Sequence, residues 1–169
     1  ETIPETSFQE TGYASVEWTD FLNGLEEKYR VVIILYYVEG FKTREIADIL
    51  QVTRSSYAMW ESNNNIIPLK RLIRLCDYFN CSLDYAMGLV SRNSFLHGKY
   101  DLSLCSQRLR EFRKENKLTQ EKLARFLHID QPTWSIYENG KSLIGTPFLY
   151  MICKKYHISA DYLLGRVDN

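Results

Sequence analysis

The residues best suited to chemistry lie in one stretch, LTQEKLARFLHIDQPTWSIYENG, which runs from Leu118 to Gly140. Trp134 and Tyr137 stand three residues apart, so a helix would carry both aromatic rings on one face. The other faces of this helix would carry Gln131, Thr133, Ser135 and Ile136, most of which are small or polar. A short helix with a bulky inner face and a small outer face suits insertion into the major groove of DNA. The pattern therefore indicates noncovalent reading of base edges.

The preceding residues supply the elements that would hold this helix in place. Apolar side chains recur at helical spacing at Leu123, Ala124 and Leu127. The dipeptide at 128–129 interrupts this stripe and indicates a turn. Asp130 suits a helix N-cap, and Pro132 falls in the first helical turn, where its missing N–H is not needed. The sequence thus predicts a helix, a short turn and a second helix.

The same pattern occurs twice in the chain. A shift of 77 residues aligns Ile46–Gly88 with Leu123–Gly165 without a gap. Identical pairs include Ala47/Ala124, Leu50/Leu127, Glu61/Glu138, Ile67/Ile144, Leu72/Leu149, Cys76/Cys153, Ser82/Ser159, Asp84/Asp161, Tyr85/Tyr162 and Gly88/Gly165. A solenoid needs about three or more units, so two copies predict a duplicated small domain.

The charge of the chain is unevenly distributed although the net charge is zero. Residues 1–27 contain seven acidic side chains and no Lys or Arg, whereas residues 28–169 contain 21 basic and 14 acidic side chains. The excess of seven positive charges permits phosphate contacts, although a solvated acidic tail beside an ordinary surface explains the same numbers. Hydrophobic residues make up 45% of the chain, which supports folded cores and excludes wholesale disorder.

Several other classes of function are disfavoured. No run of about 18 apolar residues is present, so we expect no membrane contact. The four cysteines lack metal-binding spacing, the three histidines are scattered, and no phosphate loop or nucleophile motif occurs. We therefore expect no metal, no cofactor and no enzymatic activity. Buried thiols at Cys76 and Cys153 fit a reducing cytoplasm.

These patterns divide the chain into five parts. We expect a flexible acidic leader at 1–15, a first domain at 16–89, a linker at 90–104, a second domain at 105–165 and a frayed tail at 166–169. Helices are predicted at 16–25, 25–38, 41–50 with Thr43 as N-cap, 54–61, 69–79 and 83–89, and the second domain opens with a helix at 105–116. Fully extended, the linker could reach roughly 50 Å, which exceeds one turn of DNA at about 34 Å. Both direct repeats and a two-fold arrangement remain open.

Two known families share these motifs. The motifs LREFRKENKLTQEKLA, HIDQPTWSIYENG and SADYLLG make residues 106–165 resemble a complete Cro/CI-type (XRE-type) helix-turn-helix domain. Residues 43–88 resemble the same family from its second helix onward. Residues 17–50, EWTDFLNGLEEKYRVVIILYYVEGFKTREIADIL, are similar to the front of region 4 of an extracytoplasmic-function sigma factor. The resemblance implies an all-α protein with two tandem five-helix, lambda-repressor-like domains that bind operator DNA, commonly as dimers.

The resemblance also implies a set of DNA-contacting residues. Base-reading positions fall on Arg54, Ser55, Ser56, Ala58 and Met59 in the first domain and on Gln131, Pro132, Thr133, Ser135 and Ile136 in the second. Phosphate-contacting positions fall on Gln120, Asn139 and Lys141, with weaker counterparts at Thr43, Arg44, Asn63, Asn64 and Asn65. The side-chain forks of Arg54 and Gln131 match the edges of guanine and adenine, respectively.

The leading hypothesis is a sequence-specific transcriptional regulator that represses by occupying a promoter. In this reading the helices at 54–61 and 131–138 recognise operator half-sites in double-stranded DNA, with linked domains or a homodimer covering both. The alternative is a protein-interaction module, either an antitoxin-like partner or a sigma-like piece that docks on RNA polymerase. The operator, any effector and the sign of regulation are not encoded in these motifs.

Overall fold

The structure is a computed structural model that describes residues 40, 42–61, 66–94 and 98–168. All regular elements within these residues are helices, which confirms the predicted all-α class. The expected leader and the helices predicted at 16–25 and 25–38 lie outside the described residues, as do Phe95 and Leu96 of the linker.

The first domain contributes four described helices: α3 (Thr43–Leu50), α4 (Arg54–Glu61), α5 (Leu69–Tyr78) and α6 (Leu83–Ala86). α3 takes Lys42 rather than the predicted Thr43 as its N-cap, because the Lys42 N–H donates to the Glu45 carboxylate at 2.7 Å. Gln51 ends this helix in the left-handed conformation, with a φ of 55°. Ser82 caps α6, because its hydroxyl accepts a hydrogen bond from the N–H of Tyr85.

The second domain contains five helices: α7 (Leu102–Glu115), α8 (Gln120–Phe126), α9 (Gln131–Glu138), α10 (Thr146–Tyr156) and α11 (Ala160–Leu163). α7 begins three residues before its predicted start, because the Asp101 carboxylate accepts the N–H groups of Ser103 and Leu104. The predicted cap at Asp130 is present, and Thr119 caps α8 in the same way. The end of the expected linker therefore belongs to the second domain.

The hydrophobic core does not divide cleanly between the two domains. One cluster joins α5 and α6 of the first domain to the core of the second, and it includes Leu72, Met87, Leu109 and Leu149. A smaller cluster beneath α3 and α4 is built from Ile46, Ala47, Leu50, Tyr57 and Leu75. α5 thus separates two cores and contributes side chains to each.

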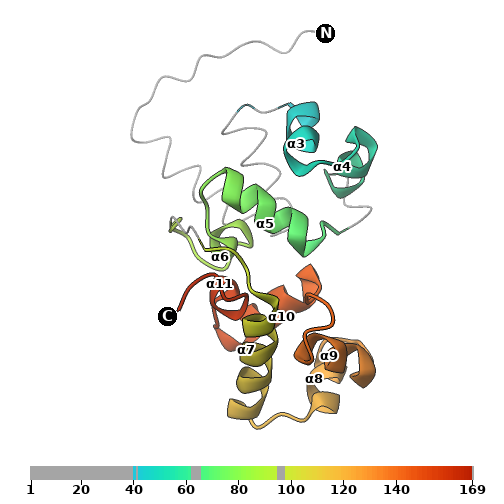
Figure 1. Ribbon diagram of the computed structural model, residues 1–169, viewed down its shortest axis with the longest axis vertical. Coiled ribbons are helices and arrows are strands. Elements are labelled where there is room, and N and C mark those ends of the chain that lie inside the picture. Colours follow the sequence, from blue (N-terminus) through green and yellow to red (C-terminus); the bar gives the residue numbers. More distant parts are fainter. Residues whose placement is uncertain (1–39, 41, 62–65, 95–97, 169) are drawn as a thin grey trace.

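The arrangement in space follows from these two cores. α5 and α6 lie between the α3–α4 pair and the second domain, and α6 contacts α11 (Figure 1). α4 and α9 lie on the same side of the molecule, to the right in that view. The linker approaches the second domain closely, since the N–H of Asp101 donates to the carbonyl of Leu164 at 3.0 Å.

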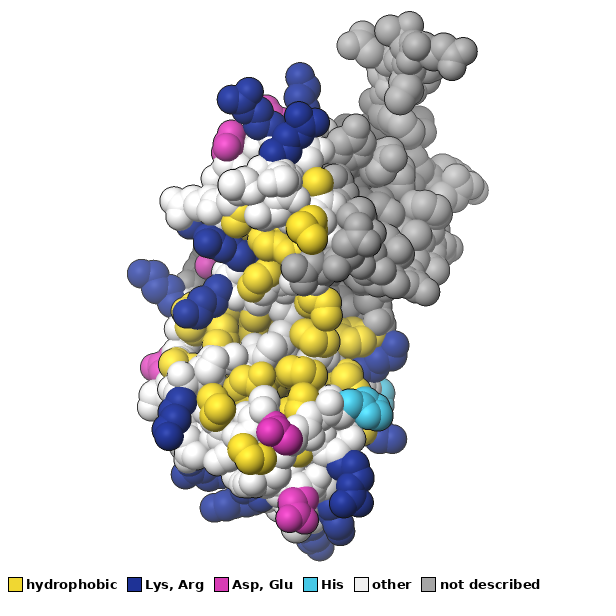
Figure 2. All heavy atoms as spheres, turned by 90° about the vertical axis from the view of Figure 1, so that its right-hand side faces the viewer, with side chains coloured by type: hydrophobic (Ala, Val, Ile, Leu, Met, Phe, Trp, Pro, Cys, Tyr) yellow, Lys and Arg dark blue, Asp and Glu magenta, His cyan; other side chains and the backbone are white. Residues whose placement is uncertain are grey.

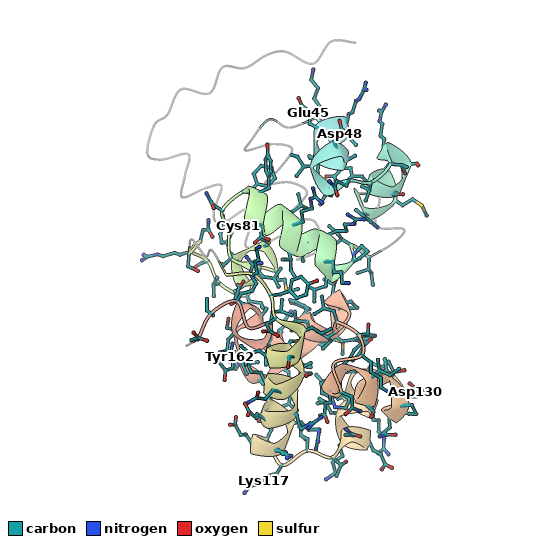
Figure 3. All side chains as sticks on the ribbon, in the orientation of Figure 1. Glu45, Asp48, Cys81, Lys117, Asp130 and Tyr162 are labelled. Atoms are coloured by element: carbon teal, nitrogen blue, oxygen red, sulfur yellow. The ribbon has the colours of Figure 1, made fainter. Side chains whose placement is uncertain are left out.

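Residues 166–168, expected to fray, pack against the rest of the protein instead. Arg166 is buried, and its guanidinium contacts Asp77 at 2.7 Å and Asp161 at 3.3 Å. Arg108 is also buried and donates to the carbonyls of Tyr162 and Val167. The guanidinium carbon of Arg108 lies 4.2 Å from the ring centre of Tyr162, which is labelled in Figure 3. Two buried arginines therefore hold the end of the chain in place.

Candidate nucleic-acid interface

The helix pair α8–α9 is locked by a few buried side chains. Leu123, Leu127 and Trp134 are each exposed by 1% or less, and Trp134 is the largest of the fully buried side chains. Between the helices, His128 takes a left-handed conformation with a φ of 55°, and the N–H of Ile129 returns to the carbonyl of Ala124 at 3.0 Å. The turn is therefore fixed by backbone hydrogen bonds. Trp134, expected on the inner face of its helix, does lie there.

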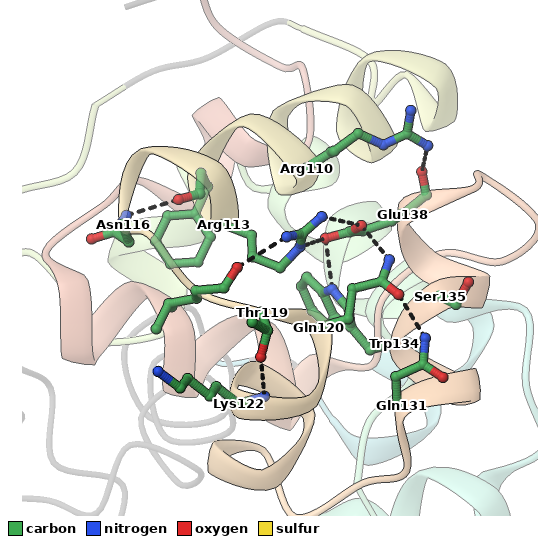
Figure 4. Close-up of polar contacts among 12 residues, drawn as sticks. Arg110, Arg113, Asn116, Thr119, Gln120, Lys122, Gln131, Trp134, Ser135 and Glu138 are labelled. Carbon is green, nitrogen blue, oxygen red and sulfur yellow. Dashed lines mark hydrogen bonds and ion pairs between the residues drawn. The ribbon is translucent and has the colours of Figure 1, made fainter.

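A buried carboxylate ties α9 to the two helices before it. Glu138 is 1% exposed and accepts hydrogen bonds from Arg113, Gln120 and the indole of Trp134 (Figure 4). Burial by itself raises the pKa of Glu138, but these hydrogen bonds and the charge of Arg113 outweigh burial and hold the pKa below its ordinary value. Arg113 also donates to the carbonyl of Leu118 at 3.0 Å, which anchors the loop before α8.

Two of the predicted DNA-contacting glutamines belong to the same network. Gln120 donates to the Glu138 carboxylate at 2.7 Å, and its carbonyl oxygen accepts from the amide of Gln131 at 2.6 Å (Figure 4). A glutamine amide carries two N–H donors and a carbonyl acceptor. Gln131 therefore retains one N–H and its carbonyl oxygen for a ligand while its orientation is set by Gln120.

A second set of contacts fixes the C-terminal end of α9. Arg110 donates to the carbonyl of Glu138 at 2.9 Å and to the side chain of Asn139 at 3.2 Å. Asn139 in turn donates to the hydroxyl of Ser135 at 3.0 Å. Two predicted contact residues, Ser135 and Asn139, are thus bonded to each other, and Lys141 beyond them is exposed.

The predicted base-reading residues of the second domain differ in exposure. Pro132 and Ile136 are exposed, whereas Gln131, Thr133 and Ser135 are half-buried. Ile136 stands out, because 41% of this large apolar residue is exposed. Asp130, labelled in Figure 3, is exposed at the start of α9. Hydrogen bonds from the Thr133 hydroxyl and from the Thr133 N–H, the latter at 3.1 Å, lower the pKa of its carboxyl.

The first domain reproduces the helix pair with different side chains. Arg54, Ser55, Ala58 and Met59 are exposed on α4, and Ser56 is half-buried. Thr53 caps α4, since its hydroxyl accepts the N–H of Ser56 at 3.2 Å. On the inner face, Tyr57 is 1% exposed and takes the place that Trp134 has in the second domain.

The phosphate-contacting positions of the first domain are less completely described. Arg44 is exposed and Thr43 is half-buried at the start of α3, while Asn63, Asn64 and Asn65 lie outside the described residues. Two arginines of α5, which the sequence reading did not single out, brace the turn between α3 and α4. Arg71 donates to the carbonyl of Leu50 at 2.8 Å, and Arg74 donates to the side chain of Gln51.

Figure 2 shows the face on which α4 and α9 lie. Lys and Arg side chains gather at both ends of this face and along its edges, and hydrophobic side chains occupy its middle. The described exposed hydrophobic residues include Met59 of α4 and Ile136 of α9. Positive charge is thus available on either side of two helices that expose small, apolar and amide side chains.

The described part of the chain carries neither a metal-binding cluster nor a membrane-spanning helix. No cluster of three or more His, Cys, Asp or Glu side chains there could hold a metal ion. Likewise, none of the described helices is long and apolar enough to cross a membrane.

Comparison with protein families supports this geometry. A family model described as "Helix-turn-helix domain" matches residues 106–169, and one described as "Helix-turn-helix" matches residues 40–85. A third, described as "Sigma-70, region 4", matches residues 15–60. Both domains therefore match helix-turn-helix families, in line with the predicted resemblance to the Cro/CI (XRE) type, and the front of the first resembles region 4 of sigma factors, as the sequence predicted.

Two curated proteins resemble part of the chain. One is an uncharacterized HTH-type transcriptional regulator, YobD of Bacillus subtilis, which is 36% identical over 63 residues, or 37% of this chain and 56% of that protein. The other is the antitoxin PezA of Streptococcus pneumoniae, which is 32% identical over 62 residues, or 37% of this chain and 39% of that protein. The matches thus span about half of the first relative and less of the second. No solved structure matches the chain significantly.

Proposed function

We propose that the protein is a sequence-specific DNA-binding transcriptional regulator that represses by occupying a promoter. In this proposal α4 and α9 each enter a major groove and read one half-site of an operator. The observation that carries it is the construction of α9. Its inner face is anchored by Trp134 and Glu138, while its outer face exposes Pro132 and Ile136 beside half-buried polar residues. A rigid helix with a small outer surface is what major-groove reading requires.

Gln131 is the residue of α9 best prepared to read a base. Adenine presents N7 as an acceptor and N6 as a donor in the major groove, and a glutamine amide satisfies both. The bond from Gln131 to Gln120 uses one N–H and leaves the other N–H and the carbonyl oxygen for such a pair. Ile136, which is exposed nearby on the same helix, suits contact with a thymine methyl group.

α4 offers a different reading surface. Arg54 is exposed in its first turn, and an arginine fork matches the O6 and N7 acceptors of guanine. Ala58 and Met59 are exposed further along and suit thymine methyl groups. The phosphate contacts are assigned to Lys141, Asn139, Gln120, Arg44 and Thr43, which flank the reading helices and would set the register on the duplex.

A second candidate function is suggested by two of the comparisons. The match to sigma region 4 and the similarity to a protein named as an antitoxin both favour an interaction with another protein. In that case the first domain would bind a partner such as RNA polymerase, and DNA binding would be weak. This reading predicts protein capture without salt-dependent binding of DNA.

The test is selection of the full chain on a random duplex library at two salt concentrations, followed by sequencing of the retained DNA. A reading regulator enriches a motif at both concentrations, with affinity that falls as salt rises because phosphate contacts release counterions. The absence of any enriched motif, or binding that vanishes at the higher salt, would refute the proposal and favour the protein-interaction function. Repression would then be tested with the selected operator placed over a promoter in a transcription assay.

A further inference from the structure

Most hydrogen bonds between the two domains join residues that are equivalent, or nearly equivalent, in the sequence repeat. Three hydrogen bonds join the domains at α6 and α11, and their partners are separated by 75, 76 and 77 residues. A fourth, at the start of α10, joins residues that are 79 apart, and the Arg166–Asp77 ion pair lies outside the repeat. The repeat offset is 77 residues. Residues in one domain therefore contact their own equivalents, or near neighbours of these, in the other domain.

The central pair of contacts is reciprocal. The N–H of Asp84 donates to the carboxylate of Asp161 at 3.0 Å, and the N–H of Ala160 donates to the carboxylate of Asp84 at 2.6 Å. The N–H of Leu83, the residue equivalent to Ala160, also bonds to the carboxylate of Asp161. Each domain thus uses its aspartate to bind the first backbone N–H groups of the other domain's last helix.

This exchange distinguishes between the two possible arrangements of the repeat. In a two-fold arrangement, position i of one domain meets position j of the other, and j meets i. Stacked direct repeats can also bring equivalent elements into contact, but two different surfaces then meet, so the exchange is not reciprocal. The reciprocal contacts between the equivalent helices α6 and α11 therefore indicate a two-fold relation.

The packing around these hydrogen bonds shows that the arrangement is a built interface. Leu83 and Ala160 are fully buried or nearly so, and both belong to the core cluster that spans the two domains. At the other end of the interface, the hydroxyl of Thr146 donates to the carbonyl of Ile67 at 2.7 Å. The two domains are consequently held in one orientation rather than joined only by the linker.

A two-fold relation has a direct consequence for α4 and α9. The two helices are equivalent in the repeat, and both lie on the same side of the molecule (Figure 1). Related by a two-fold axis, they would meet a single duplex with opposite polarity. Their exposed side chains nevertheless differ, with Arg54 and Met59 on one helix and Pro132 and Ile136 on the other.

We infer that one chain is an internal pseudo-dimer that reads, as a monomer, an inverted repeat whose two half-sites differ in sequence. This inference rests on the proposed function, because it specifies the DNA that the same two helices read. In this pseudo-dimer the Asp84–Asp161 exchange fixes the orientation of the two reading helices, as a subunit interface does in a two-chain repressor. The half-site centres should lie about one helical turn apart, or about 10 base pairs.

The inference is tested with the full chain and four duplexes built from the selected motif. These carry the two half-sites as an inverted repeat, the same half-sites as a direct repeat, one half-site alone, and the inverted repeat with five extra base pairs between the halves. We expect the inverted repeat to bind at least about 100-fold more tightly than the single half-site. The five-base-pair insertion, which rotates one half-site by about half a turn, should reduce binding to the single-site level.

Stoichiometry and a variant pair complete the test. Sedimentation of the complex should give one chain per inverted repeat. The double variant Asp84→Ala, Asp161→Ala should keep single-site affinity within about two-fold but lose at least about 10-fold of the preference for the inverted over the direct repeat. Glu115→Ala, which removes an exposed carboxylate on α7, serves as the matched control and should keep the preference.

The outcomes separate this inference from the proposed function. Equal binding to inverted and direct repeats, or two chains on each inverted repeat, would overturn the pseudo-dimer while leaving a DNA-binding regulator intact. Failure to select any half-site would overturn the proposed function itself. The comparison of duplexes uses the unmodified chain, so it decides the matter even if the double variant does not fold.

Discussion

Replacement of Glu138 by Ala should destabilise the second domain more than any change on its surface. The substitution removes the acceptor for Arg113, Gln120 and Trp134, and the indole N–H of Trp134 is fully buried. Removal of one partner of a buried ion pair typically costs about 3–5 kcal/mol, and Arg113 has a side chain that is only 15% exposed. We expect a loss of about 3–5 kcal/mol, a large part of the roughly 5–15 kcal/mol that stabilises a typical domain.

The conservative variant Glu138→Gln refines this prediction. Its amide keeps the shape of the side chain and one acceptor oxygen, so the loss should be smaller, at about 2 kcal/mol. Glu115→Ala removes an exposed carboxylate and should change stability by less than about 0.5 kcal/mol. The ion pair should also make the domain sensitive to acid, because the lowered pKa of Glu138 gives stability that is present above its ordinary pKa of 4.5 and is lost as the pH falls through the lower value of the folded state.

The assay combines urea denaturation, followed by circular dichroism, with hydrogen exchange of the folded protein. Exchange resolves the two domains, and protection should fall in α8 and α9 while α3 and α4 change little. A loss below about 1 kcal/mol for Glu138→Ala, or a larger loss for Glu138→Gln than for Glu138→Ala, would refute the reasoning that this carboxylate organises the helix pair.

Three further predictions concern the interface and the end of the chain. Burial raises the pKa of Asp161 to about 6, so the stability of the unmodified chain relative to Asp161→Asn should increase by about 1.3 kcal/mol in urea denaturation as the pH falls from about 7 to 5. A hydrogen bond from the neighbouring Cys76 thiol lowers the pKa of Cys81, whereas burial raises that of Cys153, so iodoacetamide should modify Cys81 first, as followed by mass spectrometry. A Cβ atom at Gly98 would collide with the carbonyl oxygen of Arg166, so Gly98→Ala should lower the urea midpoint by an amount equivalent to about 1–3 kcal/mol.

Each of these has a clear contrary result. A stability difference at Asp161 that is flat or falls on acidification would contradict the buried-carboxylate argument. Alkylation of Cys153 before Cys81 would show that the thiol environments are misassigned. An unchanged midpoint for Gly98→Ala would mean that the approach of the linker to the tail is looser than described.

Local signals made much of the fold predictable. The caps at Thr119 and Asp130 and the buried position of Trp134 follow from residue type and from spacing within one or two helical turns. The repeat offset predicted that the first domain would contain the same helix pair, and it does. The sequence also predicted that Cys76 and Cys153 would be buried, which the structure confirms.

Non-local contacts account for what the sequence reading missed. An arginine on a helix is usually solvated, yet Arg108 and Arg113 are bonded to groups inside the protein. Their partners lie far along the chain, at Glu138 for Arg113 and at residues 162–168 for Arg108. No periodic pattern encodes such pairings, and the same ion pairs and carbonyl contacts explain why the tail at 166–168 is ordered.

The relative orientation of the two domains could not be predicted from the sequence, for a similar reason. Asp84 and Asp161 were visible as an identical pair in the repeat, and an acidic residue in the first turn of a helix ordinarily stabilises its own helix. Here each aspartate binds the other domain's helix. This exchange can be recognised only in the three-dimensional arrangement. An identical acidic residue at equivalent helix starts is nevertheless a signal that could be searched for in other duplicated domains.

Base reading by α9 is tested most directly by one comparison on the selected operator. Binding of Gln131→Ala and of Lys141→Ala should be measured against the preferred sequence and against sequences altered at the adenine, each at two salt concentrations. We predict that Gln131→Ala loses discrimination at that one position, worth about 1–3 kcal/mol, and that Lys141→Ala weakens all sequences alike and reduces the salt slope by about 1. Equal loss on every sequence for Gln131→Ala would contradict the account.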